Sequence, residues 1–136
     1  MGPRRKFDTK HFDLKINLKS AIPIYEQIKD AVKIAIFSNK LNDNDKLISI
    51  RDISNRFNIN PITIMKAYNQ LETEGLLYSR RGSGYFVKVD KNKIEKGKSE
   101  IFQKEVNTFL KKIASLGYTP KELISIIKKI MEKKND

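Results

Sequence analysis

The chain has 136 residues, and its 28 Lys and Arg against 16 Asp and Glu give a formal net charge of +12. This length suits one domain of about 100–150 residues, or a small domain with an appendage, and the charge favours a polyanionic partner, either nucleic acid or an anionic membrane. The absence of cysteine excludes disulfides and cysteine-ligated metal sites, and no apolar run approaches the roughly 20 residues of a membrane span.

Residues 1–20 form a basic arm in which four apolar residues fall at every second position. The four are Phe12, Leu14, Ile16 and Leu18. A period of two predicts a short strand or an extended arm. Pro23 then opens a helix, because apolar residues from Ile24 to Ile36 follow the i, i+4, i+7, i+8 spacing of one helical face. An Asn- and Asp-rich run at 42–45 predicts the turn after this helix.

Two further helices follow, and each begins with a recognisable cap. Ser49 with Asp52 three residues later resembles a capping box, which predicts a short second helix. Asn60 followed by Pro61 combines an asparagine cap with proline at the first helical position, and Gly75 is a fitting end for this third helix. The apolar stripe of the third helix comprises Ile64, Ala67, Tyr68 and Leu71.

After the third helix the period changes to two, which predicts a β-hairpin. Residues 77–79 and 85–89 have strand composition, and the Gly-containing loop 80–84 joins them. Helix, short helix, tight turn, helix and hairpin together describe a winged helix-turn-helix domain over residues 21–89. We therefore predict an α+β fold, mostly α, with this N-terminal domain and a C-terminal two-helix hairpin.

A helix-turn-helix places its second helix in the DNA major groove, with its N-terminal residues towards the base edges. The exposed side of the third helix carries Asn60, Thr63 and Lys66, which can hydrogen-bond to bases or phosphates. The hairpin tip carries Arg80 and Arg81, long cations that can reach a minor groove or a row of phosphates. Near this tip Gly82 and Gly84 permit positive φ and close backbone approach, and near the second helix Arg51 and its neighbour Ser49 could meet phosphate.

A charged linker is predicted over 90–98, and two amphipathic helices over 99–136. A hairpin of about 35 residues cannot bury both of its apolar stripes alone. A second copy related by a two-fold axis is the commonest solution, and the alternative is packing against the chain's own winged domain. The predicted dimerisation residues are Phe102, Val106, Phe109, Ile113, Leu123, Ile127 and Ile130.

Five segments of the chain resemble the GntR family of bacterial regulators. They are PIYEQI at 23–28, LISIRDI at 47–53, NPITIMKAY at 60–68, LETEGLL at 71–77 and RRGSGYFV at 80–87. The short tail is most similar to the YtrA-type branch, whose tails serve as dimerisation elements. The resemblance implies DNA contacts from Arg51, Asn60, Pro61, Thr63, Met65, Lys66, Arg81 and Gly82.

The sequence departs from the family pattern at three places. Residues 39–44 read NKLNDN where the family usually has Gly-x-Leu-x-Pro-Gly, and Ile48 replaces the usual proline before the second helix. These changes affect a turn, so they bear on loop geometry more than on DNA binding. Met65 stands where arginine is frequent, so the base preference is expected to differ.

These observations predict a cytoplasmic, dimeric, sequence-specific regulator of transcription, most simply a repressor, at a two-fold symmetric operator in double-stranded DNA. The resemblance makes transporter genes plausible targets. No cofactor, metal, membrane partner or catalytic group is expected, and a small-molecule effector is left open. The rival interpretations are an architectural or plasmid-maintenance DNA-binding protein, a winged-helix protein-interaction module, and a nucleic-acid enzyme. The enzyme would need clustered carboxylates or histidines, which the sequence lacks.

Overall fold

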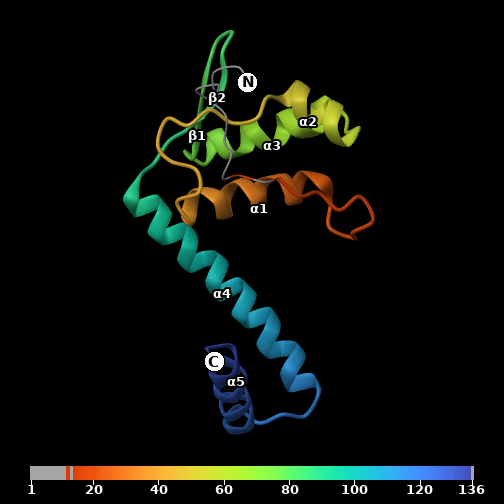
Figure 1. Cartoon of the computed structure of the whole chain (residues 1–136), viewed down its shortest axis with the longest axis vertical. Coiled ribbons are helices and arrows are strands. Elements are labelled where there is room, and N and C mark those ends of the chain that lie inside the picture. The colour runs from red at the N-terminus through yellow and green to blue at the C-terminus, as the bar shows by residue number, and fades with distance from the viewer. Residues whose placement is uncertain (1–11, 13, 136) are drawn as a thin grey trace. The chain divides into compact units, whose positions relative to one another are not determined.

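The structure is a computed structural model that describes residue 12 and residues 14–135. Most of the basic arm and the histidine, His11, lie outside the described residues. The elements are α1 (Ile24–Phe37), α2 (Ile50–Phe57), α3 (Pro61–Thr73), β1 (Leu77–Arg80), β2 (Gly84–Val87), α4 (Lys91–Ser115) and α5 (Pro120–Asn135) (Figure 1). The chain divides into two units, Met1–Gly97 and Lys98–Asp136, called here the winged unit and the tail unit. The predicted α+β, mostly α, class is confirmed.

The described part of the arm contains no strand. Phe12 and Leu14 are buried in the core, but the polar backbone nearby is satisfied by α1 and not by a partner strand. The Gln27 side chain accepts a hydrogen bond from the Asn17 N–H at 2.8 Å and donates to the carbonyls of Asn17 and Ile22. Of the two predicted alternatives, the short strand does not form in these residues, and the extended arm is not contradicted.

The predicted caps hold α2 and α3 at their N-termini. The Ser49 hydroxyl accepts from the Asp52 N–H at 3.0 Å, and the Asn60 side chain accepts from the Ile62 N–H at 2.9 Å. These bonds satisfy backbone donors that have no partner inside a helix. Asn58 ends α2 in the left-handed conformation, and Gly75 follows α3 at φ +81°. The three helices bury one face each, and the buried residues include Ile28, Val32, Ile36, Ile53, Ile64 and Leu71.

The loop after α1 keeps a left-handed backbone at two asparagines. Asn39 and Asn44, which stand where the family pattern has glycines, adopt φ of +64° and +70°. Asparagine tolerates this region far better than most residues. The loop then pairs with the hairpin, since the Asn44 N–H donates to the Val87 carbonyl and the Val87 N–H donates to the Asp45 carbonyl, both at 2.8 Å.

The hairpin is antiparallel, and its register runs from the Leu77–Val87 pair to the Arg80–Gly84 pair. The prediction had a five-residue loop over 80–84. In the structure both strands extend further towards the tip, and the turn comprises only residues 81–83. Arg80 belongs to β1 because its backbone pairs with Gly84, whose φ of +113° is accessible to glycine.

The 90–98 segment, expected to be a charged linker, is mostly helical, because α4 starts at Lys91. The Asp90 carboxylate accepts from the Asn92 N–H at 3.0 Å and so caps the helix. Lys and Glu, which dominate this segment, are good helix formers. Gly97 lies in the helix against the Phe37 ring, where a Cβ would collide with that ring.

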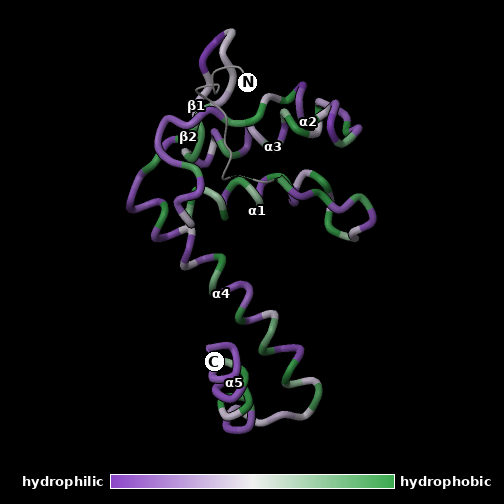
Figure 2. The backbone as a smooth tube through the Cα atoms, in the orientation of Figure 1, coloured by the Kyte–Doolittle hydropathy of each residue, from purple (hydrophilic) through white to green (hydrophobic). Residues whose placement is uncertain are grey.

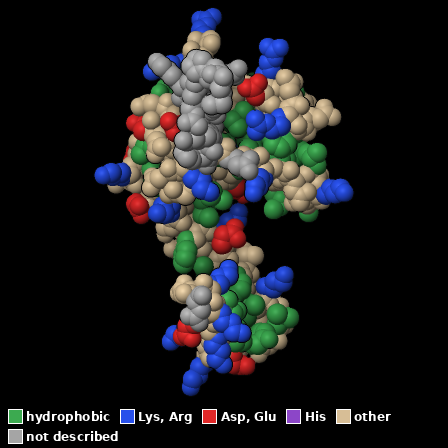
Figure 3. Space-filling view, viewed as in Figure 1, with side chains coloured by type: hydrophobic (Ala, Val, Ile, Leu, Met, Phe, Trp, Pro, Cys, Tyr) green, Lys and Arg blue, Asp and Glu red, His purple; other side chains and the backbone are tan. Residues whose placement is uncertain are grey.

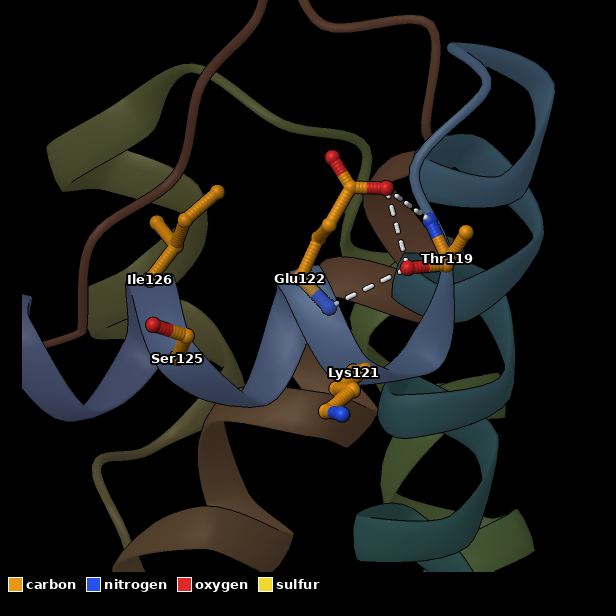
Figure 4. Close-up of a pocket in the computed structure, with 5 residues that line it drawn as sticks. All are labelled: Thr119, Lys121, Glu122, Ser125 and Ile126. Atoms are coloured by element: carbon orange, nitrogen blue, oxygen red, sulfur yellow. Dashed lines mark hydrogen bonds between the residues drawn. The ribbon is translucent and has the colours of Figure 1, made fainter.

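The second tail helix, α5, begins with the predicted capping box. Figure 4 shows the Glu122 carboxylate turned back to Thr119, from which it accepts two hydrogen bonds, while the Thr119 hydroxyl accepts from the Glu122 N–H. These bonds hold the pKa of Glu122 below its ordinary value. Among the residues that the structure describes, none of the helices has the length and apolar character to cross a membrane.

Candidate nucleic-acid interface

Helix α3 has a buried face and an opposite, exposed face. Ile64, Ala67 and Leu71 are fully buried against α1, α2 and β1. Four residues spaced i, i+4, i+7 and i+11 lie on the opposite side and are here called the outer face of α3. They are Ile62, Lys66, Asn69 and Thr73, all exposed. A helix divided in this way can lie in a groove without disturbing its own core.

The predicted α3 residues fall at different places around this face. Pro61, Met65 and Lys66 are exposed, whereas Thr63 is half-buried at its edge. Asn60 is exposed, but its Oδ1 is already bonded to the helix N-terminus, which leaves the Nδ2 group as its donor towards a ligand.

The sequence pattern singled out only Lys66 of the outer face and not Ile62, Asn69 or Thr73, and Ile62 lies nearest the N-terminus of α3. Ile62 is 52% exposed in the first turn of α3, four residues before Lys66. That i, i+4 spacing to an expected contact was the available signal. It was overlooked because an isoleucine is ordinarily assigned to the core.

The start of α2 supplies two further candidates. Arg51 is exposed in the first turn of α2, and Ser49 precedes it as the cap. The Ser49 oxygen accepts from the helix, but its O–H still has a proton to donate. Helix α2 packs against α3, so both candidates belong to the same helix-turn-helix as the outer face.

Two tyrosines and one glutamate hold α3 to the residues around it. The buried Tyr68 donates its hydroxyl to the Ile48 carbonyl at 2.7 Å, and Glu72 accepts from both the N–H and the hydroxyl of Ser79 at 2.8 Å. Tyr85 of β2 donates to the Asn69 side chain and packs edge-on against Tyr68, with ring centroids 5.1 Å apart. The helix and the hairpin are therefore held as one body.

Burial raises the pKa of these two tyrosines, which are already protonated at neutral pH. It raises the pKa of Tyr68 above its ordinary range, with a smaller contribution from Tyr85. Burial also raises the pKa of Tyr85, and the nearby Glu72 carboxylate adds to the effect. Both hydroxyls therefore remain hydrogen-bond donors at neutral pH.

The hairpin orders one of its two arginines. Tyr78 and Phe86 stack with their centroids 5.4 Å apart, and the Arg80 guanidinium lies over both rings, 5.4 Å from Phe86 and 5.8 Å from Tyr78. Such cation–π contacts orient the cation without neutralising it. Arg81 is exposed in the turn, beside Gly82 at φ +78°, where open space surrounds the position of a Cβ.

The winged unit carries many cations on its surface, and the described residues form no metal-binding cluster. Lys and Arg side chains are spread over the face of the winged unit shown in Figure 3. Within residue 12 and residues 14–135, no three His, Cys, Asp or Glu side chains lie close enough to hold a metal ion. The arrangement can bind and orient a polyanion through hydrogen bonds and charge.

Comparisons with known proteins agree with this geometry. Residues 24–87 match the family model described as "Bacterial regulatory proteins, gntR family". The chain is 31% identical to the HTH-type transcriptional regulator YhcF of Bacillus subtilis, over 84% of this chain and 94% of that protein. It is 30% identical to the HTH-type transcriptional repressor YtrA of the same organism, over 90% and 99% respectively.

The solved structures give the same result for the fold. A GntR family transcriptional regulator from Listeria monocytogenes superposes with a TM-score of 0.72 at 30% identity, covering 82% of this chain and 98% of the other. These similarities extend through the tail, as expected for regulators of the YtrA type. Members of this family are DNA-binding regulators of transcription and not enzymes. This chain belongs to the GntR family of bacterial regulatory proteins and is a transcriptional regulator of the YtrA type.

Proposed function

We propose that the protein is a dimeric repressor that binds a two-fold symmetric operator through α3 and the hairpin. The observation that carries this proposal is the outer face of α3, which is exposed along the whole helix while the opposite face is fully buried. The outer face would enter the major groove. The hairpin, held to α3 through Tyr85 and Ser79, would then lie along the adjacent backbone or minor groove.

Each predicted contact residue receives a role in this arrangement. The N-terminal part of α3, with Asn60, Pro61, Thr63, Met65 and Lys66, would face the bases and the nearest phosphates. Ser49 and Arg51 would meet phosphate beside it, and Arg80, Arg81 and Gly82 would meet the backbone or minor groove. Neutralising phosphates supplies most of the affinity, and groove contacts supply the sequence preference.

The tail unit would provide the dimer interface. In the single chain, Phe102 is 68% exposed, Phe109 is 44% exposed and Ile130 is 54% exposed. Large apolar side chains are therefore in contact with solvent. The other predicted dimerisation residues, Val106, Ile113, Leu123 and Ile127, are half-buried. Figure 2 shows hydrophobic and hydrophilic residues interleaved along α5, and Figure 3 shows hydrophobic side chains gathered beside lysines on the tail unit. A second copy would cover this surface and match a symmetric operator.

The proposed repression is supported by a similar protein and by the way in which a bound dimer would occupy a promoter. The similar YtrA of Bacillus subtilis is named a repressor, and a dimer on a promoter would block access of the polymerase. The site of action would be the cytoplasm, where bacterial DNA lies. Transporter genes are the proposed targets on the strength of the family resemblance.

No effector is assigned. An open hollow of about 450 Å³ lies at the start of α5. Figure 4 labels the residues that line it, which are Thr119, Lys121, Glu122, Ser125 and Ile126. The Glu122 carboxylate is already engaged in the helix cap. A ligand would have to compete with that cap.

The direct test is selection of bound sequences from random duplex DNA with the purified full chain, followed by footprinting on the selected site. We expect a short inverted repeat protected on both strands. Protection that spreads along any duplex would favour an architectural protein and contradict the proposed operator. Failure to bind any duplex at low ionic strength would contradict DNA binding itself.

A further inference from the structure

We propose that Ile62 and Met65 read the C5-methyl groups of thymines in the major groove, which makes these two apolar side chains specificity-determining residues of the operator. This inference rests on the proposed function, because it requires α3 to enter a duplex. Ile62 is 52% exposed and Met65 40% exposed, and they lie three residues apart, so they are neighbours on the helix surface. They are called here the apolar patch of α3.

The apolar patch is not part of the core. The buried stripe of α3 consists of Ile64, Ala67, Tyr68 and Leu71, each at most 1% exposed. Ile62 lies opposite this stripe, at the N-terminal end of the outer face. That end is the one which a helix-turn-helix directs to the base edges.

The polar groups of the first turn of α3 are largely engaged within the protein. The Ile62 N–H donates to the Asn60 side chain, and the Thr63 N–H donates to the Asn60 carbonyl at 3.0 Å. Pro61 has no N–H to offer, and Thr63 is half-buried. Recognition at the centre of this turn therefore has to use apolar contact more than hydrogen bonds.

The only apolar group on a base edge in the major groove is the thymine C5-methyl. A cytosine in the same place presents an amino group and no methyl. Ile62 would therefore prefer thymine, since methyl contact removes apolar surface of both partners from water. Met65, which is flexible and polarisable, would accommodate a neighbouring methyl.

The charges near the apolar patch identify DNA as its occupant. Lys66 follows Ile62 by one turn on the same outer face, and Arg51 is exposed on the adjoining helix α2. An apolar protein surface docked on the patch would have to leave these cations in water or pair them with acids. A duplex supplies both the phosphates and the methyl groups that the surface fits.

The experiment uses the wild-type protein and the operator found by selection. Each thymine of one half-site is replaced in turn by deoxyuridine, which removes a single methyl and leaves every hydrogen-bonding group in place. We expect about three- to fivefold weaker binding at one or two adjacent positions, as the loss of one buried methyl predicts. Replacements elsewhere should have no effect.

Variants then show which side chain contacts each thymine methyl group. At one sensitive position, Ile62→Ala should bind the thymine and the deoxyuridine operators with equal affinity. At the neighbouring position, Met65→Ala should do the same. Gln103→Ala, at an exposed polar position of α4 that belongs to no proposed contact, is the control and should keep the wild-type sensitivity at both positions.

The outcomes separate this inference from the proposed function. Equal binding of wild-type protein to thymine and deoxyuridine at every position overturns methyl reading, while the binding itself upholds the DNA-binding function. Sensitivity that persists in the Ile62→Ala/Met65→Ala double variant also overturns it, because another residue then reads the methyl. Absence of binding to any duplex overturns both. The first measurement uses no variant, so it does not depend on how a substitution affects folding.

Discussion

Arg80 and Arg81 are adjacent in sequence but lie in different surroundings. Arg80 is held in β1 over the rings of Tyr78 and Phe86, whereas Arg81 is exposed in the turn next to Gly82. An arginine on aromatic rings has fewer conformations to lose when it binds. Arg80 is therefore ordered before it binds, whereas Arg81 projects from the turn at the tip of the hairpin, where we expect it to contact a phosphate.

Replacing Arg81 with alanine is expected to weaken operator binding and to reduce its salt dependence. One lost phosphate contact per subunit lowers the slope of log K against log salt by about 0.9 per subunit. Fluorescence anisotropy between 50 and 200 mM salt, concentrations over which such contacts weaken strongly, measures both effects. The matched control is Lys112→Ala, which removes an exposed cation from the end of α4. An unchanged slope would remove Arg81 from the contact set.

At the scale of elements, α1 and α3 are joined by a cluster of charges as well as by their core. Glu74, which ends α3, lies 2.7 Å from Lys33 and 3.4 Å from Lys29 of α1. Burial alone would raise the pKa of this carboxyl, but the hydrogen bond and charges of the two lysines outweigh it and hold the pKa below its ordinary value. The ionised pair therefore favours the folded state near neutral pH.

The Glu74→Gln variant is expected to be less stable than wild type by about 0.5–1 kcal/mol near pH 7, a size typical of exposed pairs. Because the folded pKa lies below the unfolded one, the stabilisation is present above the unfolded pKa of about 4.3 and is lost as pH falls through the folded pKa. Urea unfolding at pH 7, 5 and 3 tests this. Glu105→Gln, an exposed glutamate on α4, is the control. A difference that stays constant down to pH 3 would exclude the ion pairs as its cause.

At the contact between α1 and the start of α4, replacing a helical glycine with alanine is expected to lower stability, whereas it ordinarily raises it. Glycine inside a helix ordinarily costs about 0.5–1 kcal/mol relative to alanine. At Gly97, however, a Cβ would meet the ring of the buried Phe37. We expect Gly97→Ala to lower the midpoint of thermal unfolding, and Phe37→Leu in the same chain to restore part of the loss. If Gly97→Ala instead raises the midpoint, the two side chains do not meet in solution.

At the scale of the whole molecule, the protein consists of two units with different tasks. The winged unit has a continuous core and the candidate interface with DNA. The tail unit has no fully buried residue among those described, so its helices lack a core of their own. Small helical hairpins of this kind gain stability from a partner, so the proposed dimerisation would also stabilise the fold of the tail.

If the tail forms the proposed dimer, Phe109→Asp is expected to convert it to monomers, because the variant places a charge in the proposed apolar interface. Analytical ultracentrifugation of the full chain measures the change, and operator affinity should fall with it, since two half-sites are no longer bound together. Asn107→Asp introduces the same side chain at an exposed polar position of α4 and should leave the dimer intact. A Phe109→Asp protein that sediments as wild type would place the interface elsewhere.

The local sequence determined most of the secondary structure and the family. Ser49 and Asn60 carry the side chains that cap a helix, and Gly75 provides the left-handed residue that ends one, so these boundaries depend on neighbours in the chain. The change of period from 3.6 to 2 after Gly75 likewise identifies the hairpin. Together they were enough to predict the winged helix-turn-helix.

Only the tertiary structure decided the features that depend on distant partners. In the described part of the arm, the Asn17 backbone bonds to the Gln27 side chain of α1, ten residues away, and to no strand. Arg80 lies in β1 and over two rings because the hairpin register pairs it with Gly84. Ile62 is exposed because the core of α3 is already filled from the other side, and hydrophobicity by itself cannot show which side that is.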